Sequence, residues 1–224
     1  MSELIGVIGD IHGCYLTFTA LYKELLNYTN EVYTVGDLID RGKKSKDVID
    51  FISENNIKTI RGNHEDVLLK AFDLIGNSDK SLIEIYSHHF KIGGEANFES
   101  YRGVRKPFIL ADYKKAVEDA GHLEFMKNLP VMIELPKIVI SHAGIVKDAT
   151  IKDIIWNRTK PLLKLNKFQI IGHTPQDEVL YEKNWYMNID TACVYGNKLT
   201  AVIIDKNTAE IAHVLQLHNI DLYE

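Results

Sequence analysis

The chain has 224 residues, of which 31 are acidic and 26 basic, so its formal net charge is −5 at pH 7. It is 46% hydrophobic and 25% charged, a composition typical of a folded domain and not of a disordered or fibrous chain. The net acidity argues against a protein that coats nucleic acid through phosphate contacts, and two cysteines cannot form a disulfide framework or a four-thiolate zinc site.

The first 74 residues repeat one pattern: an apolar segment, a glycine and an amphipathic segment. The apolar runs at 4–8, 32–35 and 58–60 each end at a glycine, as strands do when they turn into loops. Ser45 is predicted to be the N-cap of the second helix, and a third helix is predicted over 64–74. Strands that alternate with helices predict crossover connections and a largely parallel sheet.

Residues from about 76 to 110 break this pattern and are predicted to form a helical insertion, or cap. A helix over 111–129 is expected to stop before Pro130. The rest of the chain is predicted to be rich in strands, at 131–135, 137–141, 169–172, 186–189, 198–204 and 209–214. Because no linker-like segment or repeat separates these parts, we predict a single domain over residues 1–224.

The chain carries no recognisable targeting or membrane signal. Its first residues lack the basic segment of a signal peptide and place Asp10 where that peptide would be apolar. No uncharged apolar run approaches the roughly 18 residues that a membrane span needs. We therefore expect a cytoplasmic protein that does not bind membranes.

Five short segments combine glycine with side chains that bind metals, and each follows an apolar run. They are GDIHG at 9–13, GDLIDRG at 36–42, GNHE at 62–65, SHAG at 141–144 and GHT at 172–174. Ligands usually bind at this edge of an α/β sheet, and glycine lets the backbone come close to them. One such segment alone is more often an ordinary turn, but five of them favour a shared metal site. Carboxylate, imidazole and amide donors without thiolate favour manganese, iron or zinc.

As a set, these motifs resemble the metallophosphoesterase superfamily, in its phosphoprotein phosphatase branch. Their spacing is similar to that of bacteriophage lambda-type and bacterial serine/threonine phosphatases. The segment IDTACVYGNKLT at 189–200 adds to the resemblance, which extends from about residue 4 to residue 204. It implies an α/β calcineurin-like sandwich of two mixed β-sheets flanked by helices, with a small helical cap.

The resemblance also implies a site with two divalent metal ions, for which manganese is preferred over iron or zinc. The first metal would be held by Asp10 and His12, both metals would be bridged by Asp37, and the second would be completed by Asn63, His142 and His173. The catalytic pair would be His64, as general acid, and Asp40, which orients it. The substrate phosphate would be bound by Arg41, Asn63 and Arg158.

These roles have a chemical reason. Two cations lower the pKa of a bridging water from about 15.7 toward roughly 7, and the resulting hydroxide can attack phosphorus directly. A general acid such as His64 contributes about 10²–10⁴-fold by protonating the leaving oxygen. His64 could instead merely begin a helix, but a cationic histidine is unfavourable at that end of the helix dipole. His88 and His89 match no motif and are expected to be solvated, whereas Cys14 and Cys193 are expected to be buried.

The position after GHT is Pro175, where many phosphodiesterases and nucleases of the superfamily carry a second histidine. Together with Arg41, this favours hydrolysis of phosphate monoesters. We expect a serine/threonine phosphoprotein phosphatase, with possible action on phosphotyrosine, whose substrates are phosphorylated proteins or small phosphate esters and which forms no stable complex with nucleic acid.

Two alternatives remain open. One is a pyrophosphohydrolase of dinucleoside polyphosphates or nucleic-acid 5′ ends, which would use the same metals. The other is a non-catalytic phosphate-binding scaffold. The presence of His64 argues against the scaffold, because a pure binder needs no general acid.

Overall fold

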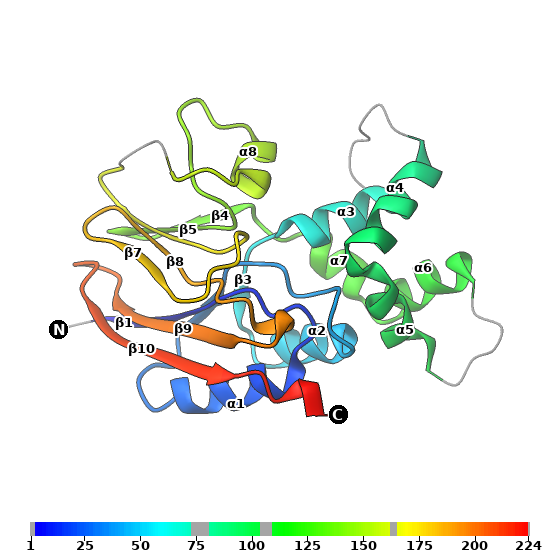
Figure 1. Cartoon of the computed structure of the whole chain (residues 1–224), viewed down its shortest axis with the longest axis horizontal. Helices are drawn as coiled ribbons and strands as arrows, with labels where there is room; N and C mark the ends of the chain where they lie inside the picture. The colour runs from blue at the N-terminus through cyan, green and yellow to red at the C-terminus, as the bar shows by residue number, and fades with distance from the viewer. Residues whose placement is uncertain (1–2, 73–80, 104–108, 162–164, 224) are drawn as a thin grey trace.

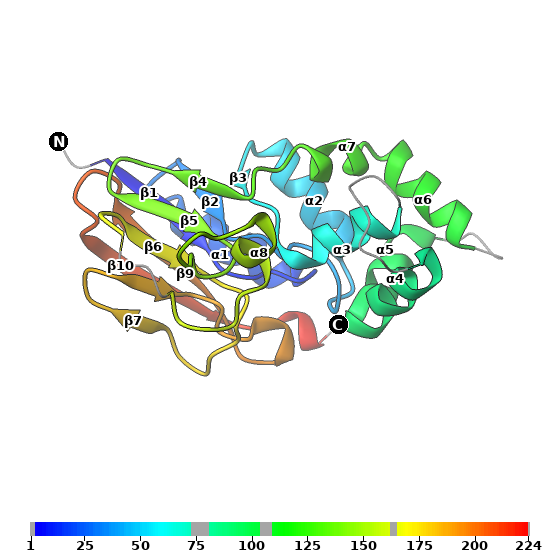
Figure 2. The ribbon, with the colours of Figure 1, turned by 90° about the horizontal axis from the view of Figure 1, so that it is seen from above.

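Two five-stranded sheets and a group of helices at one end make up the computed structural model, which describes residues 3–72, 81–103, 109–161 and 165–223 (Figure 1). The helices of the cap lie beyond the ends of the strands when the molecule is seen from above (Figure 2). No helix in these ranges is long and apolar enough to span a membrane.

The first sheet has the strand order β10-β9-β1-β2-β3. Its strands are β1 (Leu4–Ile8), β2 (Val32–Thr34), β3 (Lys58–Thr59), β9 (Lys198–Asp205) and β10 (Ile211–His218). Strands β1, β2 and β3 are parallel and are connected through α1 (Tyr15–Leu25) and α2 (Ser45–Glu54), as the alternating pattern predicts. Strand β9 pairs antiparallel with both β1 and β10, so the sheet is mixed and not largely parallel.

The second sheet has the order β4-β5-β6-β8-β7. Its strands are β4 (Met132–Glu134), β5 (Ile138–Ser141), β6 (Phe168–Ile171), β7 (Leu180–Glu182) and β8 (Tyr186–Asn188). The three inner strands are parallel and the two edge strands antiparallel. The predicted sandwich of two mixed sheets is confirmed, although the sequence indicated neither β7 nor the short helix α8 (Ile151–Trp156).

The hydrophobic core has two clusters, one on each face of β1. Ile5 and Val7 pack between the sheets, in one cluster with Ile140 of β5. Ile8 points to the other face and packs with Phe18 of α1. Because side chains alternate along a strand, β1 contributes to both layers of the core at once. Its carboxyl end is thereby fixed between the layers, where the loop that contains Asp10 begins.

The cap is defined here as residues 82–127. It consists of α4 (Leu82–His89), a π-helical turn η1 (Phe90–Gly94), α5 (Glu95–Arg102), α6 (Leu110–Asp119) and α7 (His122–Lys127). Parts of the predicted insertion, at 76–80 and 104–108, lie outside the described residues. The single helix expected over 111–129 is wrong: the chain breaks at Gly121, whose φ of +76° is left-handed.

Two helix boundaries differ from the prediction. Ser45 is not the N-cap of α2 but its first residue, and its hydroxyl accepts the backbone N–H of Asp40 at 3.0 Å. Helix α3 (Asn63–Ala71) is shorter than expected. At the carboxyl end of the chain, the short turn η3 (Asp221–Tyr223) caps α1, because the Asp221 carboxylate accepts the N–H groups of Leu16 and Thr17.

Candidate metal centre and active site

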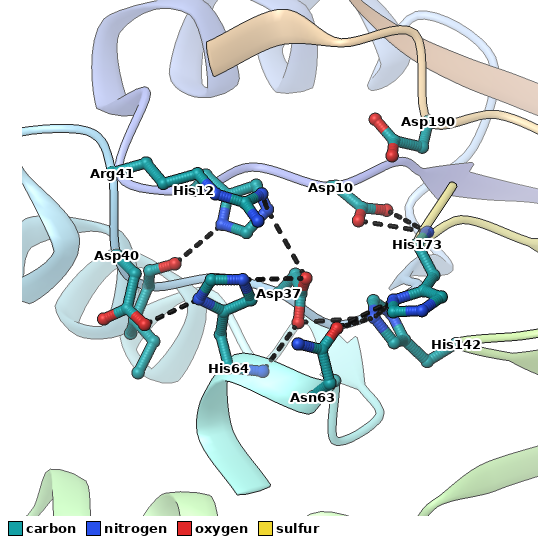
Figure 3. A network of polar contacts seen from close by, with 12 residues as sticks. Asp10, His12, Asp37, Asp40, Arg41, Asn63, His64, His142, His173 and Asp190 are labelled. Carbon is teal, nitrogen blue, oxygen red and sulfur yellow. Dashed lines mark hydrogen bonds and ion pairs between the residues drawn. The ribbon is translucent and has the colours of Figure 1, made fainter. Parts of the chain in front are cut away.

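The predicted ligands lie where strands of both sheets end, and their side chains point toward one another (Figure 3). Those from the first sheet follow β1, β2 and β3, and those from the second follow β5 and β6. All six are buried: Asp10, His12, Asp37, Asn63, His142 and His173. Loops from two facing sheets therefore meet at one polar site, which is the usual position of a ligand in such folds.

Three potential ligand atoms lie close together, one each from Asn63, His142 and His173. Asn63 Oδ1 lies 3.0 Å from His142 Nε2 and 2.7 Å from His173 Nδ1, and the two nitrogens are 3.1 Å apart. Asp37 Oδ1 is 3.3 Å from His142 Nε2. The other ring nitrogen of His142 donates to the carbonyl of Val35 at 2.8 Å, which leaves its Nε2 lone pair for the cluster.

The other oxygen of Asp37 faces a second group. Asp37 Oδ2 lies 3.4 Å from His12 Nε2 and 3.9 Å from His64 Nε2. His12 Nδ1 donates to the carbonyl of Ile39 at 2.8 Å, so its Nε2 again carries the lone pair. Asp37 thus stands between two groups of donors, one on each carboxylate oxygen, as a bridging ligand must.

Asp10 is placed differently from the other predicted ligands. Its carboxylate accepts the backbone N–H of His173 at 3.1–3.3 Å, and among the described residues it belongs to neither group of converging donors. Gly172 makes this contact possible, because a Cβ at that position would collide with Asp10 Oδ1. Burial and the nearby Asp190 carboxylate raise the pKa of Asp10 well above its usual value.

The electrostatics of the site suit cations. Burial lowers the pKa of both His12 and His173 to about 3, so both imidazoles are neutral and can act as ligands. Burial opposes a charge on His142, but Asp37 outweighs it and raises the pKa of this histidine to about 10. The Nε2 lone pair of His142 therefore attracts a positive charge, either a proton or a metal. Buried carboxylates beside neutral imidazoles form a donor set that fits divalent ions.

The site loops have an unusual backbone. Five site residues adopt left-handed conformations, with φ between +45° and +72°: His12, Asp37, Asp40, Arg41 and His173. Such conformations are uncommon for residues with a side chain, and each costs on the order of 1–3 kcal/mol when it is sparsely populated. The surrounding contacts must therefore hold these loops in place.

Glu65 supplies many of those contacts, and sequence reasoning gave it no role. This fully buried carboxylate accepts N–H groups from Asp37, Leu38 and Ile39 in one loop and from Gly62 in another, at 2.8–3.3 Å. Burial and the Asp37 charge raise its pKa to about 7. Its position three residues after the Gly62 N-cap, whose N–H it accepts, is that of the glutamate in a capping box, and this signal could have identified it.

Asp40 and His64 form a hydrogen bond of 2.6 Å between Oδ2 and Nδ1. The bond directs His64 Nε2 toward Asp37 and the donor groups. The carboxylate also contacts a residue that the sequence did not connect to the site: His89 Nδ1 lies 3.5 Å from Asp40 Oδ2. The expectation that His89 is solvated is wrong, because the ring is fully buried where the cap meets the Asp40 loop.

The two predicted arginines occupy different surroundings. Arg41 donates to His12 Nε2, so its guanidinium lies beside the donor group that contains His12. Arg158 follows α8 and is exposed. Its charge contributes, after burial and His142, to the lowered pKa of His173, so Arg158 lies on the side of the donor group that contains His173. Asp190 follows β8 and is buried beside these groups; because it follows a strand like the others, the same rule could have found it.

Comparison with known proteins gives a consistent family. The sequence profile of the calcineurin-like phosphoesterases matches residues 4–204. The bis(5′-nucleosyl)-tetraphosphatase PrpE (asymmetrical) of Bacillus subtilis (strain 168) is 29% identical over 87% of this chain and 88% of its own length. A symmetrical bis(5′-nucleosyl)-tetraphosphatase of Actinobacillus pleuropneumoniae serotype 5b (strain L20) is 30% identical over 70% of this chain but only 48% of its own length.

Solved structures share the fold. A protein assigned by inference as a diadenosine tetraphosphatase superposes with a TM-score of 0.66 at 16% identity, over 98% of this chain and 95% of its own. A serine/threonine phosphatase from Saccharomyces cerevisiae gives 0.62 at 14% identity, over 97% and 80%. Both structures therefore share the overall fold of this chain.

Proposed function

We propose that this chain, which belongs to the calcineurin-like phosphoesterase family, hydrolyses dinucleoside polyphosphates at a phosphoanhydride bond. Membership of the family makes it a metal-dependent hydrolase of phosphoesters. The choice of substrate rests on the similarity to PrpE, which covers 87% of this chain and 88% of PrpE. The matched stretch is long enough to include the cap. We therefore prefer the alternative that the sequence left open over the phosphoprotein phosphatase expected first.

The surroundings of Arg41 support a substrate with two arms. One cavity, of about 170 Å³, lies between Arg41, the loop after β1 and the carboxyl-terminal turn. A second, of about 600 Å³, is lined by Arg41, Lys43, Phe90 and Lys91, where the cap meets the core. The exposed Tyr195 ring stacks 5.3 Å from the Arg41 guanidinium. Cationic groups between aromatic rings suit phosphates flanked by bases.

The chain's donors would hold two divalent cations. We propose Asp10 and His12 for one, Asn63, His142 and His173 for the other, and Asp37 for both. When bound, the cations act as Lewis acids on the phosphate and lower the pKa of a water molecule from about 15.7 to about 7. The absence of thiolate donors favours manganese, with iron or zinc as alternatives.

The other site residues bind phosphate and move a proton. The planar guanidinium of Arg41 can bind two phosphate oxygens at once, assisted by the Asn63 amide and by Arg158 from the exposed side. Because His64 Nδ1–H donates to Asp40, its Nε2 is the atom that can hold a proton for the leaving oxygen. His12 and His142 also direct Nε2 toward Asp37, but both are proposed metal ligands held by backbone carbonyls, whereas a carboxylate holds His64.

The Asp40–His64 pair also supports a second candidate, a serine/threonine phosphoprotein phosphatase that also acts on phosphotyrosine. A serine alkoxide is a poor leaving group and depends on a proton, whereas a nucleotide phosphate leaves readily without one. The pair is therefore needed most by an enzyme that cleaves alkyl monoesters.

Product analysis tests the proposal. We would supply the purified chain and manganese with either a dinucleoside tetraphosphate or a phosphoserine peptide. We expect faster conversion of the tetraphosphate, to a mononucleotide and a nucleoside triphosphate or to two diphosphates. Faster release of inorganic phosphate from the peptide would favour the second candidate, and no hydrolysis of either substrate would reject both.

A matched pair of cap lysines tests the second cavity. Lys91→Ala is expected to raise KM for the tetraphosphate about threefold to tenfold, because one exposed charge contributes about 1 kcal/mol, and to leave KM for a small aryl phosphate unchanged. Lys115→Ala is the control, because Lys115 is also exposed on the cap but pairs with Asp119 and lines neither cavity. Equal KM values for both variants would exclude the cavity as a nucleotide site.

A further inference from the structure

The Asp40 carboxylate lies between histidines from two separate parts of the chain. His64 belongs to α3 and donates to Asp40 Oδ2 at 2.6 Å, whereas His89 ends α4 in the cap and places Nδ1 3.5 Å from the same oxygen. All three side chains are buried to 1% exposure or less. We propose that His89 is a positioning residue, which fixes the Asp40 carboxylate from the cap so that Asp40 directs the His64 imidazole toward the metal ligands.

The contact matters because Asp40 has few other constraints. Within the described residues its Oδ1 has no hydrogen-bond partner, so the direction of the carboxylate depends on what contacts Oδ2. Its backbone is left-handed, with φ of +72°, and the Ser45 hydroxyl holds its N–H, but this bond does not set the direction of the carboxylate. Burial disfavours a charge on Asp40, but His89 and His64 outweigh burial and keep its pKa well below the usual value. A buried charge without a partner would be costly, so both histidines contribute to keeping Asp40 in place.

The cap is built to hold His89 at this place. The ring stacks nearly parallel to Tyr113 of α6, at 11° and 6.3 Å, and the Tyr113 hydroxyl lies 3.5 Å from His89 Nε2. Gly94 also lies against the ring, where a Cβ would collide with the imidazole. The neighbouring Gly93 accepts the backbone N–H of Arg41 at 2.9 Å, so η1 also contacts the residue that follows Asp40.

Two variants of His89 distinguish a positioning role from simple packing, because each keeps a polar group at the place of only one ring nitrogen. In His89→Asn the amide can reach the position of Nδ1 and contact Asp40, whereas in His89→Gln it reaches the position of Nε2 on the Tyr113 side. Positioning predicts that His89→Asn is the more active variant. Packing predicts the opposite, because glutamine is closer to histidine in volume and leaves a smaller cavity.

The inference deepens the proposed function, and its kinetic readout rests in addition on cleavage of phosphate monoesters, the reaction of the second candidate. We would measure kcat for an alkyl and an aryl phosphate ester, whose leaving oxygens differ in their need for a proton. His89→Gln is expected to lower kcat for the alkyl ester about tenfold, since small misplacements of a catalytic group cost up to about 10²-fold, and to change the aryl ester less than twofold. His89→Asn should recover most of the loss. In a His64→Asn background, His89→Gln should cause no further loss.

Two further variants complete the design. His122→Gln is the matched control, because His122 is another buried cap histidine but contacts Tyr101 and Asp50 and not Asp40; the ratio of the two kcat values should stay at its original value. Gly94→Ala moves the His89 ring without changing its chemistry. Its φ of −64° accepts alanine, so it should repeat the effect of His89→Gln. If His89→Gln does not fold, Gly94→Ala and His89→Asn carry the test.

A readout without substrate separates this inference from the proposed function. In ¹⁵N-labelled protein, the downfield proton that His64 Nδ1 shares with Asp40 should shift or broaden in His89→Gln and Gly94→Ala, and stay unchanged in His122→Gln. The positioning role is overturned if the proton is unmoved in both variants, if His89→Asn is as impaired as His89→Gln, or if the losses from His64 and His89 simply multiply. Absence of tetraphosphate hydrolysis by the unmodified chain would reject the proposed function, and absence of ester hydrolysis would remove the kinetic readout; in both cases the NMR result decides this inference.

Discussion

The loops that follow the strands and the cap hold their histidines in different ways. In the loops, His12 and His142 each donate one ring nitrogen to a backbone carbonyl, which turns the other nitrogen to the ligand cluster. In the cap, the ring nitrogens of His89 and His122 face side chains of the described residues, among them the core carboxylates of Asp40 and Asp50. Histidines fixed by the backbone suit metal binding, whereas histidines between side chains join one part of the fold to another. Changes in the loops should therefore abolish the chemistry, and changes in the cap should only tune it.

The largest effect is expected at Asp37. In Asp37→Asn the bridging charge is lost although the shape is kept, so most bound metal should be lost and hydrolysis should fall about 10⁴-fold or more, equivalent to at least about 5 kcal/mol of transition-state stabilisation. Elemental analysis of the purified variant checks the metal content.

The matched control is Asp66→Asn. Asp66 is also buried, in α3, but forms ion pairs with Arg61 and Lys70 and not with the ligand cluster. Its metal content should be unchanged. Two ions per chain in Asp37→Asn would disprove the bridge and remove the distinction between loops and cap.

The next effect concerns His64 and sharpens the comparison, because His64 is held by Asp40, which the cap residue His89 also contacts. We expect His64→Asn to retain its metal and to slow alkyl phosphate esters about 10²–10³-fold, but aryl esters less than tenfold, because only the poorer leaving group needs a proton. Asp40→Asn should show the same selectivity to a smaller extent. Equal slowing of both esters would contradict the role of His64 as a proton donor.

The sequence predicted the loops better than the cap for a physical reason. Each ligand directly follows an apolar run, and a strand of any length ends where polar residues begin, so local pattern is enough to place His142 and His173. The buried position of His89 depends on a contact with Asp40, far away in the sequence, and no periodicity within α4 indicates it. Glu65 and Asp190 did carry local signals, a capping box and a strand end, that were not used.

Short elements were also beyond prediction. The strand β7 has three residues and the helix α8 has six. These segments are too short to show the apolar spacing of a strand or of a helix. The break at Gly121 was missed because the apolar spacing continues on both sides of it. The left-handed backbone at Asp37 and Arg41 depends on contacts between loops, such as those of Glu65, that no single segment contains.

A smaller effect is expected from Arg41→Lys. A lysine keeps the charge but cannot form the planar two-pronged contact with phosphate, so kcat/KM should fall about tenfold, and inorganic phosphate should inhibit less strongly. The backbone bond from Arg41 to Gly93 is unaffected by the change. Arg61→Lys is the control, because Arg61 reaches only backbone carbonyls near α7 and an ion pair with Asp66. Similar inhibition constants for phosphate in both variants would show that Arg41 does not bind the phosphate.

The smallest effect concerns how acid loosens the cap. His122 bonds to Tyr101 at 2.6 Å and to Asp50 at 2.9 Å, and thereby joins α7, α5 and α2. Burial lowers the pKa of His122 below its ordinary 6.5, so the released imidazole takes up protons more readily than the docked one. The contribution of His122 to cap docking is therefore complete above about pH 6.5 and decreases as the pH falls below that value. The pKa of Asp50 is lowered from 3.8, because bonds from Lys46 and His122 outweigh burial, so its own contribution is lost only below about pH 3.8.

Amide hydrogen exchange, corrected for intrinsic rates, should accelerate in α5 and α7 between pH 7 and pH 5 but not in β1 and β9. His122→Gln should remove the pH dependence in the cap, and acceleration that is equal in the sheet and the cap would show that acid destabilises the whole chain instead.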